Sequence, residues 1–362
     1  MRIEELGFSE WEEALPDDDF DVFHTREALE VVDEHTSADL RLLGGFKGQQ
    51  RVGLAPMFVS DLRVGRLVTS PPLGLGIGRL GTIVTPTSPK RRKREAVNRS
   101  FSEGVLEATK AYDRTTIFRM ACDTWYTDPR SFGWAGFNVV PSFTYQIDLN
   151  SSKSPDDVMD EFSRDRRKEV RGKDESGIVI RSDRPGGADL VYDAIDRRYD
   201  EQGLDVPFSK EYVLDLVDAL DDRARVYVAE SESGEFLSGI IALYSNDTAY
   251  NWKGGAKRSN TDSSVSANSL LHWQIIEDVL TDPELDSISK YDMYTANNER
   301  LVRYKSSFGG DLVPYYTIES KGIGITLAKA LYRMAELNKD PTGNRSLASL
   351  REKLSLSREP VN

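Results

Sequence analysis

The chain has 362 residues, of which 39% are hydrophobic and 30% charged, and this balance is typical of a two-domain globular protein with no membrane span. Its formal net charge of −13 argues against non-specific DNA binding, which depends on Lys and Arg contacts to phosphates. One cysteine and three histidines exclude an internal disulfide and a cysteine-based zinc site, give little support to a Ser-His-Asp triad, and lead us to expect no metal centre.

The acidic, amphipathic N-terminus lacks the basic region and apolar core of a signal peptide, and we expect a cytoplasmic protein. Asp outnumbers Glu, and Arg outnumbers Lys. This bias resembles that of proteins that work in concentrated salt, where ions screen the repulsion between like charges. We therefore expect a halophilic environment, which by itself does not bear on activity.

The first half of the chain shows alternating helix and strand signals, and we assign residues 1–150 to a first domain. A loop that contains Ser70-Pro71-Pro72 and several glycines interrupts them. The hydrophobic spacing predicts helices over about 25–35 and 89–112 and strands over 40–46, 52–58, 115–120 and 137–147.

Two motifs in this half carry possible ligand chemistry. Residues 76–81 match the glycine pattern of a dinucleotide fingerprint, but a strand-like run follows where the fingerprint needs a helix, so we reject it. Residues 90–94 are five consecutive bases at a predicted helix start, where cations oppose the helix macrodipole. An anionic partner is one explanation, and high salt that makes the cost negligible is the one we favour.

The second half shows a regular order of elements, and we assign residues 151–320 to a second domain. Ser154, Pro155 and Asp157 predict a capped helix start. A further helix over about 323–338 is expected to pack on the first domain, and residues 339–362 read as a polar tail. The predicted helices are 154–174, 187–202, 209–220, 266–280 and 298–307, and the predicted strands are 178–180, 225–230, 236–244, 248–253, 287–294 and 312–318.

Four segments together resemble the FemAB-like branch of the GNAT acyltransferase superfamily, also described as BioF2-like. They are Ser70-Pro71-Pro72 with its glycines, the basic helix 162–171, the segment 267–273, and the closing motif that joins Tyr291-Asp292 to Tyr304-Lys305 and Phe308-Gly309. The resemblance implies an α+β fold of two tandem GNAT-like (acyl-CoA N-acyltransferase) domains, each a mixed sheet flanked by helices.

The resemblance also implies the reaction. It predicts an N-acyltransferase that moves an acyl or aminoacyl group from an acyl-CoA or an aminoacyl-tRNA to an amine by direct attack, with acyl-CoA as a co-substrate and no tightly bound cofactor. The acceptor would be a small molecule or a cell-envelope precursor. Two departures keep other interpretations open: the glycine loop 254–258 differs from the usual pyrophosphate loop, and the long helical arm of some peptidoglycan-bridge members is missing. The alternatives are an aminoacyl-tRNA-dependent transferase and a non-catalytic binding protein for an anionic envelope precursor or partner.

The catalytic candidates lie in the closing motif. A lysine among aromatic side chains can serve as a fixed cation for an anionic or developing oxyanionic group. We expect Lys305 to stabilise the oxyanion or a donor phosphate, and Tyr294 or Tyr304 to give a proton to the leaving group. The alternative is a surface lysine beside core aromatic residues.

Four candidates for substrate binding lie upstream of this motif. Arg167 and Arg171 belong to a run of bases that would hold an anionic group, or that forms a solvated helix face offset by nearby acids. Trp252 and Lys253 end a strand where the sheet is expected to open, so they would line the pocket; a core tryptophan is the alternative.

Three further candidates surround the closing motif. Asn268 would cap the following helix, whose N-terminus suits a carbonyl or phosphate oxygen. Asp292 would orient the acceptor amine, or would simply pair with a nearby arginine. Phe308 completes the motif beside Tyr304 and Lys305.

Overall fold

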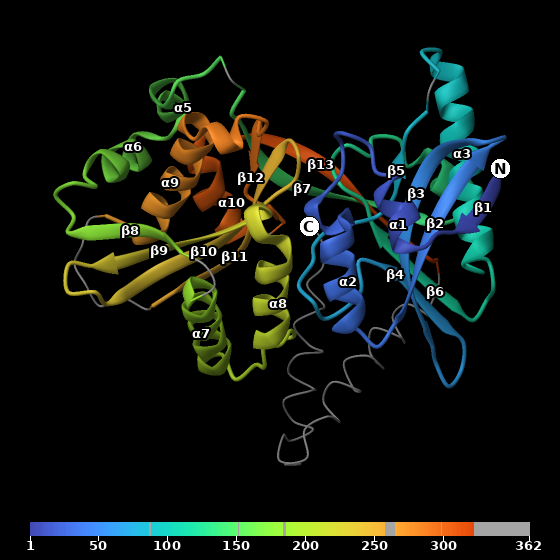
Figure 1. Ribbon diagram of the computed structural model, residues 1–362, viewed down its shortest axis with the longest axis horizontal. Coiled ribbons are helices and arrows are strands. Elements are labelled where there is room, and N and C mark those ends of the chain that lie inside the picture. Colours follow the sequence, from blue (N-terminus) through green and yellow to red (C-terminus); the bar gives the residue numbers. More distant parts are fainter. Residues whose placement is uncertain (87, 151, 184–185, 258–264, 298, 322–362) are drawn as a thin grey trace, which may run out of the picture. The chain divides into compact units, whose positions relative to one another are not determined.

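The structure is a computed structural model, and it describes residues 1–86, 88–150, 152–183, 186–257, 265–297 and 299–321. Residues Met1–Ser320 form one compact unit (Figure 1). The predicted helix 323–338 and the polar tail 339–362 lie outside the described residues. No described helix combines the length and the apolar character that a membrane crossing requires.

The first half begins the sheet and contributes one long helix. Its predicted helices and strands are all present, and β1, β4, β5, α1 and α4 add to them. The elements are β1 (Arg2–Glu5), α1 (Phe8–Glu12), α2 (Arg26–Glu34), β2 (Asp39–Lys47), β3 (Gln50–Asp61), β4 (Arg66–Ser70), β5 (Ile83–Val84), α3 (Arg91–Ala108), β6 (Thr116–Ala121), α4 (Arg130–Trp134) and β7 (Asn138–Asp148).

The second half follows the predicted order, with two differences. The helix predicted over 154–174 is broken, because Phe162 turns into the core and Ser163 starts a new helix as its N-cap. The strand predicted over 287–294 is three residues long. The elements are α5 (Pro155–Glu161), α6 (Arg164–Arg171), β8 (Ile178–Asp183), α7 (Gly186–Glu201), α8 (Lys210–Leu220), β9 (Ala224–Ser231), β10 (Phe236–Tyr244), β11 (Thr248–Ala256), α9 (Ala267–Thr281), β12 (Lys290–Asp292), α10 (Glu299–Lys305) and β13 (Asp311–Glu319).

The described strands form one mixed sheet of 13 strands. Its order is β1-β2-β3-β4-β6-β13-β7-β12-β11-β10-β9-β8, and β5 pairs with β3 outside this path. The two halves meet where β13, the last strand of the chain, is inserted between β6 and β7 of the first half. Strand β7 in turn pairs with β12 of the second half. Each half therefore completes the sheet of the other.

The second-half sheet is covered by helices on both faces (Figure 1). Residues alternate along β9, so that Val226 and Val228 face the core beneath α7 and α8, whereas Tyr227 and Ala229 face the core beneath α9. The first of these cores continues into the first half, where Phe23 contacts Trp252. A shared core and a shared sheet explain why the two halves form a single unit.

Candidate active site

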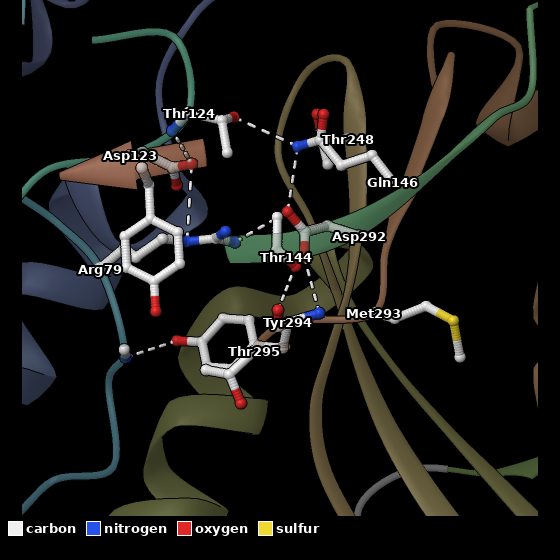
Figure 2. A network of polar contacts seen from close by, with 12 residues as sticks. Arg79, Asp123, Thr124, Thr144, Gln146, Thr248, Asp292, Met293, Tyr294 and Thr295 are labelled. Carbon is white, nitrogen blue, oxygen red and sulfur yellow. Dashed lines mark hydrogen bonds and ion pairs between the residues drawn. The ribbon is translucent and has the colours of Figure 1, made fainter. Parts of the chain in front are cut away.

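We call the place where β7 pairs with β12 and β13 the junction of the two halves. The strand register there places polar side chains from three strands together. On β7, Thr144 and Gln146 are two residues apart and so point to the same face of the sheet. Asp292 of β12 pairs directly with Gln146. Asp123 follows the end of β6 and completes the group. All lie in the network shown in Figure 2.

Asp292 is fully buried and is the centre of this network. Its carboxylate accepts hydrogen bonds from Thr144 Oγ1 (2.6 Å), Gln146 Nε2 (3.0 Å) and the backbone N–H of Tyr294 (2.6 Å). Arg79 Nη2 donates a fourth bond of 2.9 Å. Of the two roles expected for Asp292, the structure shows the pairing with an arginine, and the role toward an acceptor amine stays a prediction.

Arg79 is the functional candidate that the sequence analysis did not single out. Its side chain is 1% exposed, and Nε lies 3.5 Å from the carboxylate of Asp123. The guanidinium also lies 5.2 Å from the ring centres of both Tyr294 and Tyr315. Arg79 thus joins a carboxylate of the first half to one of the second. The only sequence signal was an arginine inside the rejected glycine motif.

A third buried carboxyl group belongs to Asp21, which precedes α2. Burial, and then the neighbouring Asp123, raise the pKa of Asp21 well above its ordinary value. The junction therefore holds three buried carboxyl groups, from Asp21, Asp123 and Asp292, beside the guanidinium of Arg79. A proton on Asp21 reduces the excess negative charge, which is the expected response when like charges are buried together.

The rejected glycine motif has a structural role at this junction. Strands β11 and β12 pair only from Thr248 to Tyr250, after which β11 continues without β12 and pairs with β10 alone. The segment 76–79 crosses this opening: the carbonyl of Gly76 accepts a 2.7 Å bond from Lys253 Nζ, and the N–H of Gly78 donates a 2.6 Å bond to the hydroxyl of Tyr294.

Both glycines of this segment lie in close contact with neighbouring side chains. A Cβ atom on Gly76 would lie 2.2 Å from Lys253 Nζ, and one on Gly78 would lie 2.9 Å from the ring of Tyr294. Gly76 also has a φ of +63°, which disfavours any larger residue.

Lys253 lies in an apolar setting on β11. Its ammonium lies 4.3 Å from the ring centre of Phe208 and 4.9 Å from that of Trp252. Burial lowers the pKa of Lys253 to about 7, so that the amine is close to half neutral near neutral pH. Trp252 itself is buried in the core against Phe23 and Tyr212, which matches the core alternative.

Lys305 is buried at the end of α10 and is directed toward the junction. Its Nζ donates to the main-chain carbonyls of Met293 and, at 2.8 Å, Thr295. These bonds hold the turn that carries Tyr294, whose φ is +68°. Burial lowers the pKa of Lys305 to about 8, although the nearby Asp292 opposes this effect. Lys305 is therefore not a surface lysine. Two of its three ammonium N–H groups bond to these carbonyls, and the third remains.

A second cluster forms around Arg166 of α6. Its guanidinium lies 4.7 Å from the ring centre of Tyr304 and 4.8 Å from that of Phe308, and it also bonds Ser269 at the start of α9. Asn268 Nδ2 donates a 2.7 Å bond to the hydroxyl of Tyr304. Asn268 does not cap α9 as expected, because Ser266 occupies the N-cap position.

The structure therefore separates the predicted site residues into two groups. Lys305, Tyr294 and Asp292 lie at the junction, and Lys253 is linked to it through the segment 76–79. Tyr304 and Phe308 pack against Arg166, and Asn268 bonds to Tyr304. Three predicted residues join neither group, and one of them is Trp252, which is buried in the core. Arg167 donates to the carbonyl of Asp160, and Arg171 is exposed.

The described residues contain no group of three or more His, Cys, Asp or Glu side chains placed to hold a metal ion. Burial lowers the pKa of His24 to about 4 and that of His272 to about 3, so both are neutral at pH 7. Lys253 and Lys305 are therefore the candidates for acid–base chemistry near neutral pH, since their pKa values are lowered to about 7 and about 8.

Residues 161–306 match the family described as the acetyltransferase (GNAT) domain. Most of the second half is thus similar to a GNAT acetyltransferase domain. The matched segment contains both lysines and both tyrosines of the two clusters, together with α6, α9 and α10. Among proteins with curated functions, none matches this sequence.

Solved structures confirm the fold over nearly the whole chain. The crystal structure of FemX aligns with a TM-score of 0.66 at 12% identity, covering 87% of this chain and 97% of FemX. The C-terminal domain of a putative lysylphosphatidylglycerol synthetase from Agrobacterium fabrum aligns with a TM-score of 0.52 at 10% identity, covering 84% and 95%. The L-PGS structure from Bacillus licheniformis aligns with a TM-score of 0.51 at 12% identity, covering 90% and 96%.

These findings confirm the resemblance to the FemAB-like branch and the predicted α+β fold of two tandem GNAT-like domains. They support an acyltransferase activity, and they specify neither the donor nor the acceptor. At such low identities the shared fold does not carry the substrates of these proteins over to this chain.

Proposed function

We propose that the protein is an N-acyltransferase that moves an acyl or aminoacyl group from a thioester or ester donor to an amine. The observation that carries the proposal is that Lys305 holds the turn that carries Tyr294, while the hydroxyl of Tyr294 and the ammonium of Lys253 both bond to the segment 76–79, within residues that match a GNAT acetyltransferase domain. Acyl-CoA is the proposed co-substrate, and the proposed location is the cytoplasm. The acceptor would be a small amine or an amine of a cell-envelope precursor.

In the proposed reaction the acceptor nitrogen forms a bond to the donor carbonyl carbon, and the carbon–sulfur or carbon–oxygen bond then breaks. Lys305 would stabilise the developing oxyanion with its remaining N–H. Lys253 would accept the proton that the amine nitrogen loses, because its neutral form is well populated near pH 7.

The leaving thiolate or alkoxide needs a proton. Burial raises the pKa of Tyr294 above its ordinary value, so its hydroxyl keeps a proton to donate. Tyr304 is the second candidate, and burial also raises its pKa. Arg166 beside Tyr304 pairs with Glu169 at 2.6 Å, so a phosphate of the donor would compete with that carboxylate for the guanidinium; on this basis the α6–α9 cluster is the proposed donor anion site.

The donor is tested first by thermal-shift titration in high KCl with acetyl-CoA and longer acyl-CoAs, because a ligand that binds only the folded state raises the unfolding midpoint. Charged tRNA is the next donor, and the name lysylphosphatidylglycerol synthetase on one structural neighbour is a reason to include lysyl-tRNA. A saturable shift followed by transfer to an amine supports the proposal.

The decisive variant is Lys305→Ala, which we expect to abolish turnover. Removing the side chain leaves the carbonyls of Met293 and Thr295 without a donor, so a loss of about 1–3 kcal/mol in stability is also expected. Lys290→Ala is the matched control, since it removes a part-exposed lysine from β12. Unchanged turnover in folded Lys305→Ala would remove Lys305 from the mechanism.

A non-catalytic binding protein is the second candidate function. The observation that favours it is the segment 76–79, which bonds to both sides of the opening between β11 and β12. Donor binding without transfer to any of a panel of primary amines would favour this candidate over the transferase.

A further inference from the structure

Two carboxyl groups near the junction make contacts that two ionised carboxylates would not make. Asp21 precedes α2, Asp123 follows β6, and both side chains are buried. Each accepts a backbone N–H at Oδ1, from Phe23 for Asp21 and from Thr124 for Asp123. Each leaves Oδ2 buried without a hydrogen-bond partner among the described residues. The two side chains are nevertheless hydrogen-bonding neighbours, and two carboxyl groups can bond to each other only if one carries a proton.

The charge balance of the junction also calls for a proton. Three buried carboxyl groups, from Asp21, Asp123 and Asp292, lie with two buried cations, Arg79 and Lys305. With every carboxyl group ionised, one negative charge would have no counter-charge in a place that water does not reach. Buried acids in this situation keep a proton instead. One proton makes the charges of the cluster balance.

The hydrogen bonds place this proton on Asp21 and Asp123 rather than on Asp292. Asp292 accepts four hydrogen bonds, one of them from Arg79 at 2.9 Å, and these compensate its charge. Arg79 Nε lies 3.5 Å from Asp123 and forms no hydrogen bond with it. Asp21 accepts a single hydrogen bond, from a backbone N–H of the described chain. The pair is therefore the less compensated part of the cluster.

Apart from Arg79, no described group that faces the pair supplies a positive charge. His24 Nδ1 accepts the backbone N–H of Asp21, and burial lowers the pKa of His24 to about 4, so this ring is neutral above pH 5. Tyr250 of β11 and Tyr294 approach from the second half. Burial raises the pKa of both tyrosines, so their hydroxyls stay neutral.

We propose that Asp21 and Asp123 share one proton, and that this proton makes the junction of the two halves sensitive to alkaline pH. Arg79 connects Asp123 of the first half to Asp292 of the second half (Figure 2). Loss of the proton leaves a buried carboxylate without a counter-charge beside this connection, and so weakens the contact between the halves. This device belongs to the fold and does not depend on the acyl transfer proposed above.

The direction of the pH effect follows from proton linkage. In the unfolded chain an aspartate loses its proton near pH 4, whereas burial and the neighbouring Asp123 raise the pKa of Asp21 in the folded protein. The proton therefore stabilises the folded state fully below about pH 4. Its contribution decreases as pH rises further, until the folded pair also loses the proton. Over this range the pair should increase the unfolding equilibrium constant about tenfold per pH unit.

The variant Asp21→Asn removes the proton and keeps the shape of the side chain. Its amide permanently provides the donor that the shared proton provides in the pair. In urea unfolding between pH 5 and 7, the unmodified protein should lose stability relative to the variant, by about tenfold in the unfolding equilibrium constant per pH unit. On unfolding at pH 6 in weak buffer, it should also release about one proton more per chain than the variant.

Asp200→Asn is the matched control, because it makes the same substitution at an exposed position of α7. It should change neither the pH dependence nor the number of protons released. The histidines and the buried lysines also bind or release protons on unfolding, but they are common to all three proteins, so the comparison isolates the pair.

Infrared spectroscopy of the unmodified protein decides the matter even if Asp21→Asn does not fold. The folded protein at pH 7 should show the carbonyl stretch of a protonated carboxyl group, and thermal unfolding should remove this band. Absence of the band would overturn the proposal. Equal proton release from folded Asp21→Asn and the unmodified protein would also overturn it, and would indicate that a water molecule bridges two ionised carboxylates.

Discussion

At the scale of single residues, Arg79 is a buried cation of the junction. It is the guanidinium placed between Asp123 and Asp292, and all three side chains are buried. Removing one member of a buried ion group leaves an uncompensated charge, which costs more than the intact group contributes. Substitution of Arg79 should therefore strongly destabilise the junction.

We predict that Arg79→Met lowers the free energy of unfolding by about 3–5 kcal/mol. Urea unfolding at pH 7 measures this loss. Arg63→Met, at an exposed position, should change stability by no more than about 0.5 kcal/mol. A loss below about 1 kcal/mol in Arg79→Met would show that the junction does not depend on this charge.

The two buried lysines predict a bell-shaped pH profile for kcat/KM. The proposed proton acceptor Lys253 is neutral above its pKa of about 7, so activity should rise as pH increases through 7. The proposed oxyanion stabiliser Lys305 loses its charge above its pKa of about 8, so activity should fall above 8.

Lys305→Arg separates the two limbs of this profile. An arginine stays charged at all accessible pH values, so any residual activity of the variant should lack the alkaline fall. The acid limb should remain near pH 7, because Lys253 is unchanged. A profile that stays flat from pH 6 to 9 in the unmodified protein would remove both lysines from the proton chemistry.

At the scale of elements, helix α3 packs against two paired glycines of the sheet. Gly45 of β2 and Gly53 of β3 are register partners, and a Cβ atom on either would lie 2.4 Å or 2.7 Å from the ring of Phe101. The absent side chains let this aromatic ring lie directly against the strands. Hydrophobic periodicity does not predict such a contact, because glycine carries no hydrophobic signal.

We predict that Gly45→Ala costs about 1–3 kcal/mol of stability through overpacking against Phe101. Gly133→Ala is the control: it lies in α4, and its new Cβ would meet only Val139 at 3.7 Å. That change should be neutral or slightly stabilising. Thermal unfolding of the two variants, together with Gly45→Ala combined with Phe101→Leu, tests the contact. A double variant no more stable than Gly45→Ala alone would argue against it.

At the scale of the whole molecule, the two GNAT-like halves depend on one another. The sheet of the first half contains β13, and β12 of the second half pairs with β7 of the first. The core beneath α7 and α8 also extends between the halves. Separating the halves would expose strand edges and apolar surface together.

We predict that residues 1–150 do not fold independently. Without β13, strands β6 and β7 of this piece lose their partner and present open edges. Circular dichroism and limited proteolysis should show an unstable or aggregated chain, whereas residues 1–321 should unfold cooperatively. A cooperative transition for residues 1–150 would show that the first half is an independent domain.

The sequence by itself determined the local structure and the fold class. Apolar spacing, caps and turn residues act over a few positions, so they predicted nearly every major helix and strand. The closing motif between residues 291 and 309 also singled out Lys305 and Tyr294, because it lies within one short stretch of chain, and their roles stay predictions. The break before Ser163 was missed because Phe162 continues a helical pattern, and only its burial against α9 and α10 ends the helix.

Only the tertiary structure decided how the site is assembled. Arg79 and Asp292 are 213 positions apart, and Gly76 reaches Lys253 over 177 positions. No local pattern encodes such pairs, because an ion pair depends on which strands become neighbours and in which register. Here the insertion of β13 between β6 and β7 sets that register, and burial then converts ordinary charged side chains into a coupled network.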